Sequence, residues 1–228
     1  MNIALILAGG TGTRLGASIP KQYIDVGGKP IISYCLERFF EHPQVDAIQV
    51  VAETSWYDFI QKQMPEKREK FRGFSLPGEN RQLSILNGLM DIDRYAKAED
   101  VVIIHDAARP CVSAQLLSRG LALMREREGV MPVLPMKDTV YYSEDGEKIS
   151  SLLSREKIFA GQAPEFFRFG RYKAANQVLV PEEICCISGS TEPAILYGMD
   201  MGIIPGEEAN FKITTSQDLQ RFRQMMEE

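Results

Sequence analysis

Leu5-Ile6-Leu7-Ala8-Gly9-Gly10-Thr11-Gly12-Thr13-Arg14-Leu15-Gly16 decides the fold of this 228-residue chain, and Pro20-Lys21-Gln22 follows it closely. The apolar run that leads into it, Ile3 to Leu7, predicts a buried parallel strand. The glycines that follow permit positive φ and let a ligand approach the main chain. Exposed N–H groups in such a loop bind phosphate oxygens, and Arg14 and Lys21 add two positive charges. The stretch therefore predicts a strand that ends in a triphosphate-binding loop.

Two common glycine-rich motifs do not fit this loop. Gly10 and Gly12 match the first two glycines of the dinucleotide pattern G-x-G-x-x-G, but Leu15 stands at the third position. The Walker A pattern needs Gly-Lys-Ser/Thr, which occurs nowhere in the chain. The chain has instead the pattern Leu-Ala-Gly-Gly-x-Gly-x-Arg-Leu-Gly, followed by Pro-Lys-Gln. This pattern resembles the signature of nucleotidyltransferases that join an NTP to a sugar or polyol phosphate.

Composition predicts one globular domain over residues 1–228, because 44% of the residues are hydrophobic and 25% are charged. The net charge of -5 argues against non-specific binding to nucleic acid. No apolar run of 18 residues occurs, and residues 1–8 run straight into the first predicted strand, so we expect neither a membrane span nor a signal peptide. The four cysteines lack metal-site spacing and are expected to be reduced. We therefore expect a cytoplasmic protein.

Hydrophobic periodicity predicts an alternation of strands and helices. Strands are expected at 2–7, 47–52, 73–77, 100–105, 130–136, 202–205 and 209–213. Helices are expected from Lys29-Pro30 onwards, at 54–64, from 81, at 113–127 with a Ser113 cap, at 168–180, from after Glu192 to about Tyr197, and after Thr215 with Asp218 in a near capping box. Residues 160–167 are expected to form a tight loop. This alternation is typical of an α/β fold, a Rossmann-like and mostly parallel sheet with helices on both faces.

The pattern changes at residues 137–157, where alternating residues flank Asp145-Gly146 and predict a β-hairpin. A hairpin inserted into such a domain is expected to project from it as an arm. Tyr141, Leu152 and Leu153 would then be exposed unless another surface covers them, so we expect a homodimer formed through this arm. The alternative is a hairpin that folds back on its own domain, in which case these side chains need no partner.

Ligands bind at the carboxyl ends of parallel strands in such sheets, and several charged residues are predicted to lie there. Asp106 ends an apolar strand, and Arg109 follows three residues later. Lys212 lies in the last predicted strand. A bound triphosphate carries Mg²⁺, which prefers oxygen ligands, and Asp106 is the expected metal ligand. A helix cap is the alternative role of Asp106, and an edge lysine is the alternative for Lys212.

These groups suit nucleotidyl transfer. An ionised phosphate oxygen of the substrate attacks the α-phosphorus of the NTP, and pyrophosphate leaves. Such a nucleophile needs no general base, so catalysis consists of positioning and charge stabilisation. Arg14, Lys21 and Lys212 are the expected catalytic cations.

The chain resembles the CTP-dependent cytidylyltransferases that act on 2-C-methyl-D-erythritol 4-phosphate or D-ribitol 5-phosphate. The landmarks of this resemblance are residues 7–16, 20–22, 78–84, 105–110, 137–139, Arg155, 161–167 and 210–214. The resemblance implies a Rossmann-like domain with the arm reaching a second subunit, with Mg²⁺ as cofactor, in isoprenoid or teichoic acid biosynthesis. It implies nucleotide contacts from Leu7, Ala8, Gly9, Gly10, Thr11, Gly12, Gly78, Glu79, Ser84 and Asp106, and substrate contacts from Arg109, Thr139 and Arg155.

The opening Leu-Ala-Gly-Gly and the pair Gly161-Gln162 are more similar to the ribitol branch, which predicts D-ribitol 5-phosphate as the preferred acceptor. Two segments depart from the family pattern. Gln162-Ala163-Pro164-Glu165 replaces Gln-Thr-Pro-Gln, which loses a hydroxyl and adds a charge. The family's Thr-Asp-Glu/Ala has no clean match, since Gly189 stands where the aspartate is expected in an ungapped alignment and Thr191-Glu192 in a gapped one.

Three hypotheses follow from the sequence. The first is a cytidylyltransferase acting on a polyol phosphate, with 2-C-methyl-D-erythritol 4-phosphate as the alternative acceptor. The second is another sugar-phosphate nucleotidyltransferase, such as a uridylyltransferase. The third, motivated by the departure at Gly189, is a nucleotide-binding protein without turnover.

Overall fold

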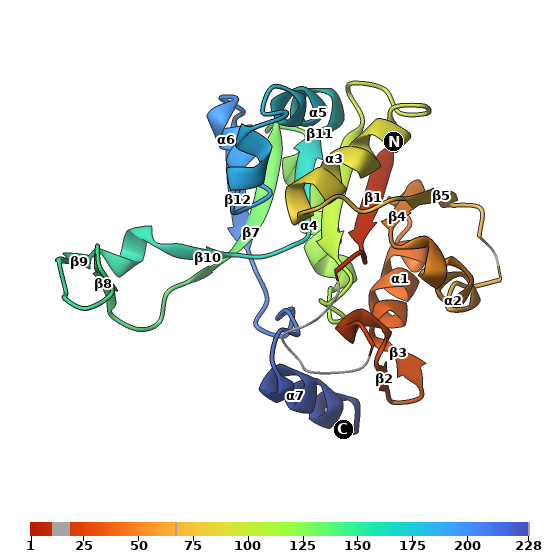
Figure 1. Cartoon of the computed structure of the whole chain (residues 1–228), viewed down its shortest axis with the longest axis horizontal. Coiled ribbons are helices and arrows are strands. Elements are labelled where there is room, and N and C mark those ends of the chain that lie inside the picture. Colours follow the sequence, from red (N-terminus) through yellow and green to blue (C-terminus); the bar gives the residue numbers. More distant parts are fainter. Residues whose placement is uncertain (11–18, 67, 228) are drawn as a thin grey trace.

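A computed structural model describes residues 1–10, 19–66 and 68–227 of the chain. An eight-stranded sheet runs through the molecule in the order β10-β7-β11-β6-β1-β4-β5, and β12 pairs with β7 (Figure 1). Strands β6, β1, β4 and β5 are mutually parallel, whereas β11 runs antiparallel to both β6 and β7. This confirms the predicted α/β fold, a mostly parallel sheet with helices on both faces.

The strands of the main sheet are β1 (Asn2–Leu7), β4 (Ala47–Val51), β5 (Phe71–Ser75), β6 (Val101–Asp106), β7 (Gly129–Pro135), β10 (Phe159–Gly161), β11 (Glu165–Arg168) and β12 (Met201–Pro205). Two small sheets pair β2 (Asp25–Val26) with β3 (Lys29–Pro30) and β8 (Val140–Tyr142) with β9 (Ser151–Leu153). The α-helices are α1 (Ile31–Glu41), α2 (Tyr57–Lys62), α3 (Arg81–Ile92), α4 (Ala114–Leu123), α5 (Phe169–Gln177), α6 (Glu192–Leu196) and α7 (Ser216–Glu227). Short 3₁₀ turns lie at Lys21–Tyr23, Thr54–Trp56, Arg155–Lys157 and Glu183–Cys186.

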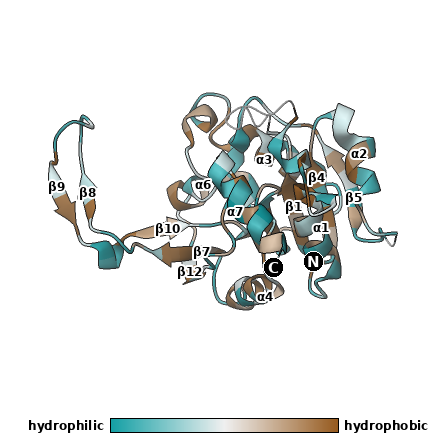
Figure 2. Cartoon of the chain, turned by 90° about the horizontal axis from the view of Figure 1, so that it is seen from below, coloured by the Kyte–Doolittle hydropathy of each residue, from teal (hydrophilic) through white to brown (hydrophobic). Residues whose placement is uncertain are grey.

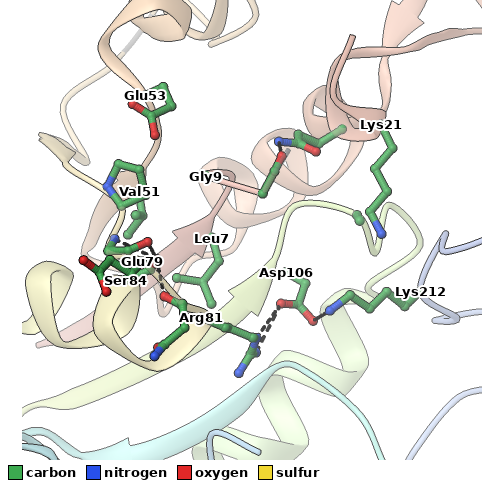
Figure 3. Close-up of a pocket in the computed structure, with 16 residues that line it drawn as sticks. Leu7, Gly9, Lys21, Val51, Glu53, Glu79, Arg81, Ser84, Asp106 and Lys212 are labelled. Atoms are coloured by element: carbon green, nitrogen blue, oxygen red, sulfur yellow. Dashed lines mark hydrogen bonds and ion pairs between the residues drawn. The ribbon is translucent and has the colours of Figure 1, made fainter. Parts of the chain in front are cut away.

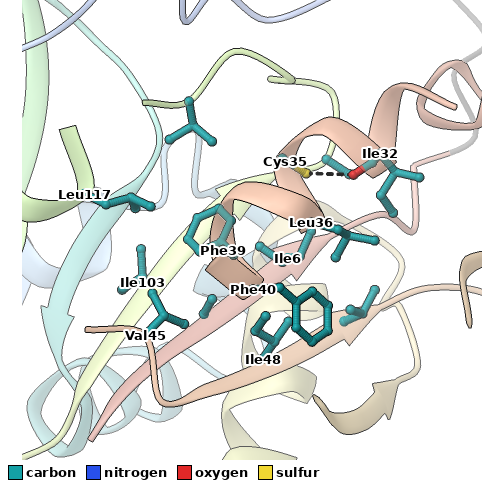
Figure 4. Close-up of a cluster of buried hydrophobic side chains, with 14 of the residues drawn as sticks. Ile6, Ile32, Cys35, Leu36, Phe39, Phe40, Val45, Ile48, Ile103 and Leu117 are labelled. Atoms are coloured by element: carbon teal, nitrogen blue, oxygen red, sulfur yellow. Dashed lines mark hydrogen bonds between the residues drawn. The ribbon is translucent and has the colours of Figure 1, made fainter. Parts of the chain in front are cut away.

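The two faces of the sheet carry separate hydrophobic cores. Helices α1 and α4 cover one face, where Leu36 and Phe39 of α1 meet Ile6 and Ile103 of the sheet (Figure 4). Helices α3, α5 and α6 cover the other face over Leu5 and Val102. Because both faces are covered, strands β1, β4 and β6 consist of nearly continuous apolar residues.

Local signals position the ends of two helices as predicted. The side chain of Ser113 accepts a hydrogen bond from the Leu116 N–H at 2.9 Å and caps α4. At α7, the Asp218 carboxylate accepts the Thr215 N–H at 2.8 Å, while the Thr215 hydroxyl accepts the Asp218 N–H at 3.2 Å. These reciprocal bonds form the predicted capping box.

The hairpin formed by β8 and β9 extends away from the sheet, as both views of the chain show (Figures 1 and 2). Tyr141 is 55% exposed and Leu152 is 65% exposed, whereas Leu153 is only partly exposed. The turn contains Gly146 at φ 76°, a backbone conformation that favours glycine. The projecting arm of residues 137–157 is therefore present in the structure, with apolar side chains facing outwards.

Three predictions from the sequence were wrong in detail. Residues 160–167, predicted as a tight loop, contain β10 and the start of β11 joined by Gln162-Ala163-Pro164. Residues 209–213, predicted as a strand, form no regular element, because Asn210 is held by side-chain contacts to Ala163 and main-chain contacts to Arg109. The first long helix begins at Ile31, after Pro30 instead of with it.

Candidate active site

A cleft of about 410 Å³ opens at the carboxyl ends of β1, β4 and β6, and we call it the strand-end cleft. This volume lies within the range of small-molecule sites. The described residues that line it are Leu7, Gly9, Gly10, Lys21, Gln22, Val51, Glu53, Pro77, Gly78, Glu79, Asn80, Arg81, Ser84, Asp106, Ala108 and Lys212 (Figure 3). Nine of the residues predicted from the sequence are thereby brought to one place, namely Leu7, Gly9, Gly10, Lys21, Gly78, Glu79, Ser84, Asp106 and Lys212.

The start of the glycine loop is held by a side chain that follows it in sequence. The buried Gln22 amide donates to the carbonyl of Ala8 at 2.6 Å and to that of Gly10 at 2.8 Å. A side chain at Gly9 would bring its Cβ to 2.6 Å from Pro77, so the loop can lie this close to Pro77 only as glycine. The predicted residues Thr11, Gly12 and Arg14 lie outside the described residues.

The opposite wall of the cleft is the turn that leads into α3. The Gly78 N–H donates to the Ser84 hydroxyl at 3.0 Å, and Asn80 caps the helix by accepting the Leu83 N–H at 2.9 Å. A Cβ at Gly78 would lie 2.4 Å from the Leu83 Cβ, so this wall also requires glycine. Short polar groups of this kind can read the edge of a base.

Asp106 lies between three cations at the centre of the site. Arg81 contacts one carboxylate oxygen, Oδ1, through Nε and Nη2, both at 3.1 Å, and the Lys212 Nζ lies 2.9 Å from the other oxygen (Figure 3). The Arg109 Nε is 3.8 Å from Oδ2. Burial raises the pKa of Asp106, but the positive charges of Arg81, Lys212 and Arg109 outweigh that effect and hold this pKa well below its ordinary value.

Arg109 belongs to this cluster but does not line the cleft. Its side chain is only 13% exposed, and its Nη1 donates to the Asn210 carbonyl at 2.7 Å. The Ile213 N–H in turn donates to the Ala108 carbonyl at 2.9 Å. These contacts fix the irregular segment 209–213 against the end of β6, and this is how Lys212 reaches Asp106 without belonging to a strand.

Thr139 and Arg155 lie on the arm and do not line the strand-end cleft described here. Both are exposed, and the Arg155 guanidinium donates to the Lys137 carbonyl at 2.9 Å at the base of the arm. Within one chain, the structure therefore does not bring these two predicted residues together with Asp106.

Two charged residues were not predicted as functional, namely Arg81, which lines the cleft, and Glu165, which lies on the neighbouring strand β11. Arg81 is the first residue of α3, a position where a charge is usually solvated, and nothing in the local pattern indicates that it turns back to Asp106. Glu165 was noted only as a departure from the family pattern, yet it is 6% exposed and accepts the Ser190 hydroxyl. Burial raises the pKa of Glu165 above its ordinary value.

The donor set around Asp106 fits a magnesium ion that arrives with a nucleotide. Among the described residues, no group of three or more His, Cys, Asp or Glu side chains could hold a metal ion by itself. Mg²⁺ commonly takes one or two carboxylates and completes its shell with phosphates and water. Asp106 offers one carboxylate at the strand end, where a triphosphate would supply the remaining oxygens.

Among residues 1–10, 19–66 and 68–227, no helix combines the length and apolar character needed to cross a membrane.

This chain is similar to a family and to several known proteins that are named as cytidylyltransferases. The family model described as 2-C-methyl-D-erythritol 4-phosphate cytidylyltransferase matches residues 2–228. A protein of that name from Geobacter metallireducens is 40% identical over 221 residues, covering 95% of this chain and 93% of the relative. A ribitol-5-phosphate cytidylyltransferase from Streptococcus pneumoniae serotype 2 is 32% identical over 234 residues, covering 100% of this chain and 99% of the relative. The crystal structure of 2-C-methyl-D-erythritol 4-phosphate cytidylyltransferase from Francisella tularensis is 26% identical, with a TM-score of 0.81 and 98% of each chain covered.

Proposed function

Since the chain belongs to the 2-C-methyl-D-erythritol 4-phosphate cytidylyltransferase family, we propose that it transfers CMP from CTP to a polyol phosphate and releases pyrophosphate. The observation that carries this proposal is the convergence of Arg81, Lys212 and Arg109 on Asp106 at the edge of the glycine loop. Cations gathered at the carboxyl ends of parallel strands suit a triphosphate.

The nucleotide would lie across the strand-end cleft. The glycine loop with Arg14 and Lys21 would hold the β- and γ-phosphates, because backbone N–H groups and cations bind phosphate oxygens. Gly78, Glu79 and Ser84 would contact the cytosine. Asp106 would contact the ribose, and Lys212 would contact the α-phosphate.

The acceptor phosphate would attack the α-phosphorus of CTP. A new phosphorus–oxygen bond forms to the acceptor phosphate, while the bond between the α-phosphorus and the pyrophosphate oxygen breaks. The attacking oxygen is already ionised, so no side chain has to take a proton. Lys212 and Lys21 would stabilise the charge that develops on the α-phosphate and on the leaving pyrophosphate.

Asp106 would hold Mg²⁺ together with the phosphates of CTP. The ion, when bound, neutralises phosphate charge and orients the triphosphate. Both Asp106 oxygens now face cations, and entry of the triphosphate would give Arg81 and Lys212 phosphate oxygens to bind in its place.

We propose that two copies of the chain form a dimer through the arm, with Thr139 and Arg155 completing the site of the partner subunit. The exposed Tyr141 and Leu152 support this, because the free energy falls when apolar side chains on a projecting hairpin are buried against another surface. A Leu152→Glu variant should sediment as a smaller species than the wild type. Equal sedimentation of the two proteins would count against the arm as the interface.

Two acceptors are candidates, and a different observation favours each. The opening Leu7-Ala8-Gly9-Gly10 and the pair Gly161-Gln162 favour D-ribitol 5-phosphate. The relative with 40% identity is named for 2-C-methyl-D-erythritol 4-phosphate, which favours that acceptor. The preference for D-ribitol 5-phosphate remains a prediction.

The test is pyrophosphate release with CTP and Mg²⁺ in the presence of each acceptor, with UTP as the control nucleotide. Turnover with one acceptor alone would establish both the reaction and the branch. Preferential turnover with UTP would favour another sugar-phosphate nucleotidyltransferase. CTP binding without turnover of any polyol phosphate would favour a non-catalytic nucleotide-binding protein.

A further inference from the structure

The strand-end cleft occupies one half of the sheet edge. Its lining comes from Leu7 on β1, Val51 on β4 and Pro77 after β5, and Asp106 on β6 forms its boundary. In the sheet order, β11 lies on the far side of β6 from β1. An acceptor that attacks in line with the leaving pyrophosphate must approach from the side away from the triphosphate. If the nucleotide fills the β1–β4–β5 half, the acceptor lies over β6 and β11.

Glu165 is the charged residue that β11 presents to this second half. It pairs with Ile104, which lies two residues before Asp106 on β6. Because side chains alternate along strands, Glu165 and Asp106 belong to the same face of the sheet. Its carboxyl group is buried, and it accepts a hydrogen bond from the hydroxyl of Ser190, which is only 2% exposed.

Ser190 belongs to a loop of small polar residues, Ser188 to Thr191, that leads into α6. This loop is fixed from several directions. The Tyr172 hydroxyl donates to the Ser190 carbonyl at 2.6 Å, and the Glu192 carboxylate accepts the Ser188 N–H at 2.8 Å. The Ser190 hydroxyl donates its hydrogen bond to Glu165, and this contact connects the 188–191 loop to β11, the strand beside β6 and Asp106.

We infer that Glu165 and Ser190 form a positioning pair that holds the 188–191 loop against the acceptor half of the site, so that affinity for the acceptor depends on the pair and affinity for CTP does not. This inference rests on the proposed function. It also gives a role to the two departures in the sequence, since Glu165 and the Gly189 region meet in one contact.

The pair can be tested by three variants of the full chain. Ser190→Ala removes the hydroxyl that Glu165 accepts. Glu165→Gln keeps an oxygen that can accept it and serves as the conservative variant. Ser188→Ala is the matched control, because its exposed hydroxyl makes no hydrogen bond with the residues that the structure describes. The readouts are KM for the polyol phosphate that the wild type turns over and the Kd for CTP, measured by calorimetry without acceptor.

Ser190→Ala should raise the acceptor KM by about tenfold or more and leave the Kd for CTP within about twofold, whereas Glu165→Gln and Ser188→Ala should keep the acceptor KM within about threefold of the wild type. An unchanged acceptor KM in Ser190→Ala would overturn the inference. So would an equal rise in the Kd for CTP, or an equal effect of Ser188→Ala. Failure of the proposed function shows in the wild type alone, as no turnover of any polyol phosphate, and it would remove the inference with it.

Discussion

Asp106 and Lys212 illustrate what single residues can and cannot disclose. Their placement in one cleft is predictable, because Asp106 ends a buried strand and because the chain resembles a family with a lysine near its end. The third member of the cluster, Arg81, is not predictable, since its contact with Asp106 joins residues 25 apart and depends on how α3 packs on the sheet. No feature of the sequence around Arg81 indicates how α3 packs on the sheet.

Lys212→Gln tests the cation expected at the α-phosphate. Loss of a preorganised positive charge should lower kcat by about 100-fold to 1000-fold, with a smaller effect on CTP affinity. Steady-state kinetics and calorimetry with CTP measure the two quantities. Lys173→Gln is the control, because Lys173 forms its ion pair with Asp93 away from the cleft. Equal kcat values for Lys212→Gln and the wild type would remove Lys212 from the reaction.

Arg81→Lys tests whether the geometry of the guanidinium matters beyond its charge. Arginine contacts Asp106 through two nitrogens, which an ammonium group cannot reproduce. We expect kcat/KM for CTP to fall by about tenfold, which corresponds to about 1.4 kcal/mol. Arg94→Lys serves as the control, since the Arg94 side chain is 80% exposed. If both variants keep wild-type kcat/KM, only the charge of Arg81 is needed.

Helices begin where the sequence predicts them when a local signal, such as a capping residue, determines their start. Ser113, Thr215 and Asp218 cap the helices in which they were predicted, because capping bonds span only three residues. Residues 160–167 were misread because Gly161 and Pro164 indicate a turn, whereas pairing of Phe166 with Ile103 and Val130 decides the structure. Tertiary pairing overrides local preference in that segment.

Asp218→Ala tests the capping box of α7, the helix that follows Lys212. Burial raises the pKa of Asp218, but hydrogen bonds from Thr214 and Thr215 outweigh it and lower this pKa to about 2. A lowered carboxyl pKa stabilises the fold above the ordinary pKa of about 4, and this stabilisation is lost as pH falls towards 2. We expect Asp218→Ala to lower the free energy of unfolding by about 1 kcal/mol at pH 7.

Urea unfolding of Asp218→Ala and the wild type between pH 7 and pH 3 measures this difference. It should be constant above about pH 5 and shrink below about pH 4, because the Asp218 carboxylate of the unfolded chain becomes protonated there while that of the folded protein stays ionised. Gln217→Ala lies in the same turn and should change stability by less than about 0.5 kcal/mol. A difference that stays constant down to pH 3 would show that the charge of Asp218 is not involved.

At the scale of the whole molecule, the sequence predicts the packing of the domain but not the surroundings of its arm. The sheet and its two cores were predictable from apolar runs and helix periodicity, because burial on both faces leaves a strong pattern. A surface that would cover the arm was not predictable, because Tyr141 and Leu152 remain exposed in one chain.

Mixing two inactive variants tests whether the arm completes the site of a partner subunit. Lys212→Gln damages the site within one chain, and Arg155→Gln damages the arm. If Arg155 acts on the partner, each mixed dimer contains one intact site of two. Since about half of randomly mixed dimers are mixed, we expect about a quarter of the wild-type activity. Activity no higher than the average of the separate variants would place Arg155 in the site of its own chain.

The contacts of Asp106 have one more consequence, which concerns how a nucleotide enters. Two cations of the cleft, Arg81 and Lys212, are already assembled around the Asp106 carboxylate, so a triphosphate that binds there would replace one anionic partner with another instead of ordering loose side chains. Its entry would then be an ion exchange, in which the salt of the solution competes for the same groups. Inorganic phosphate and sulfate would compete with CTP, and the buffer chosen for an assay would set part of the apparent affinity.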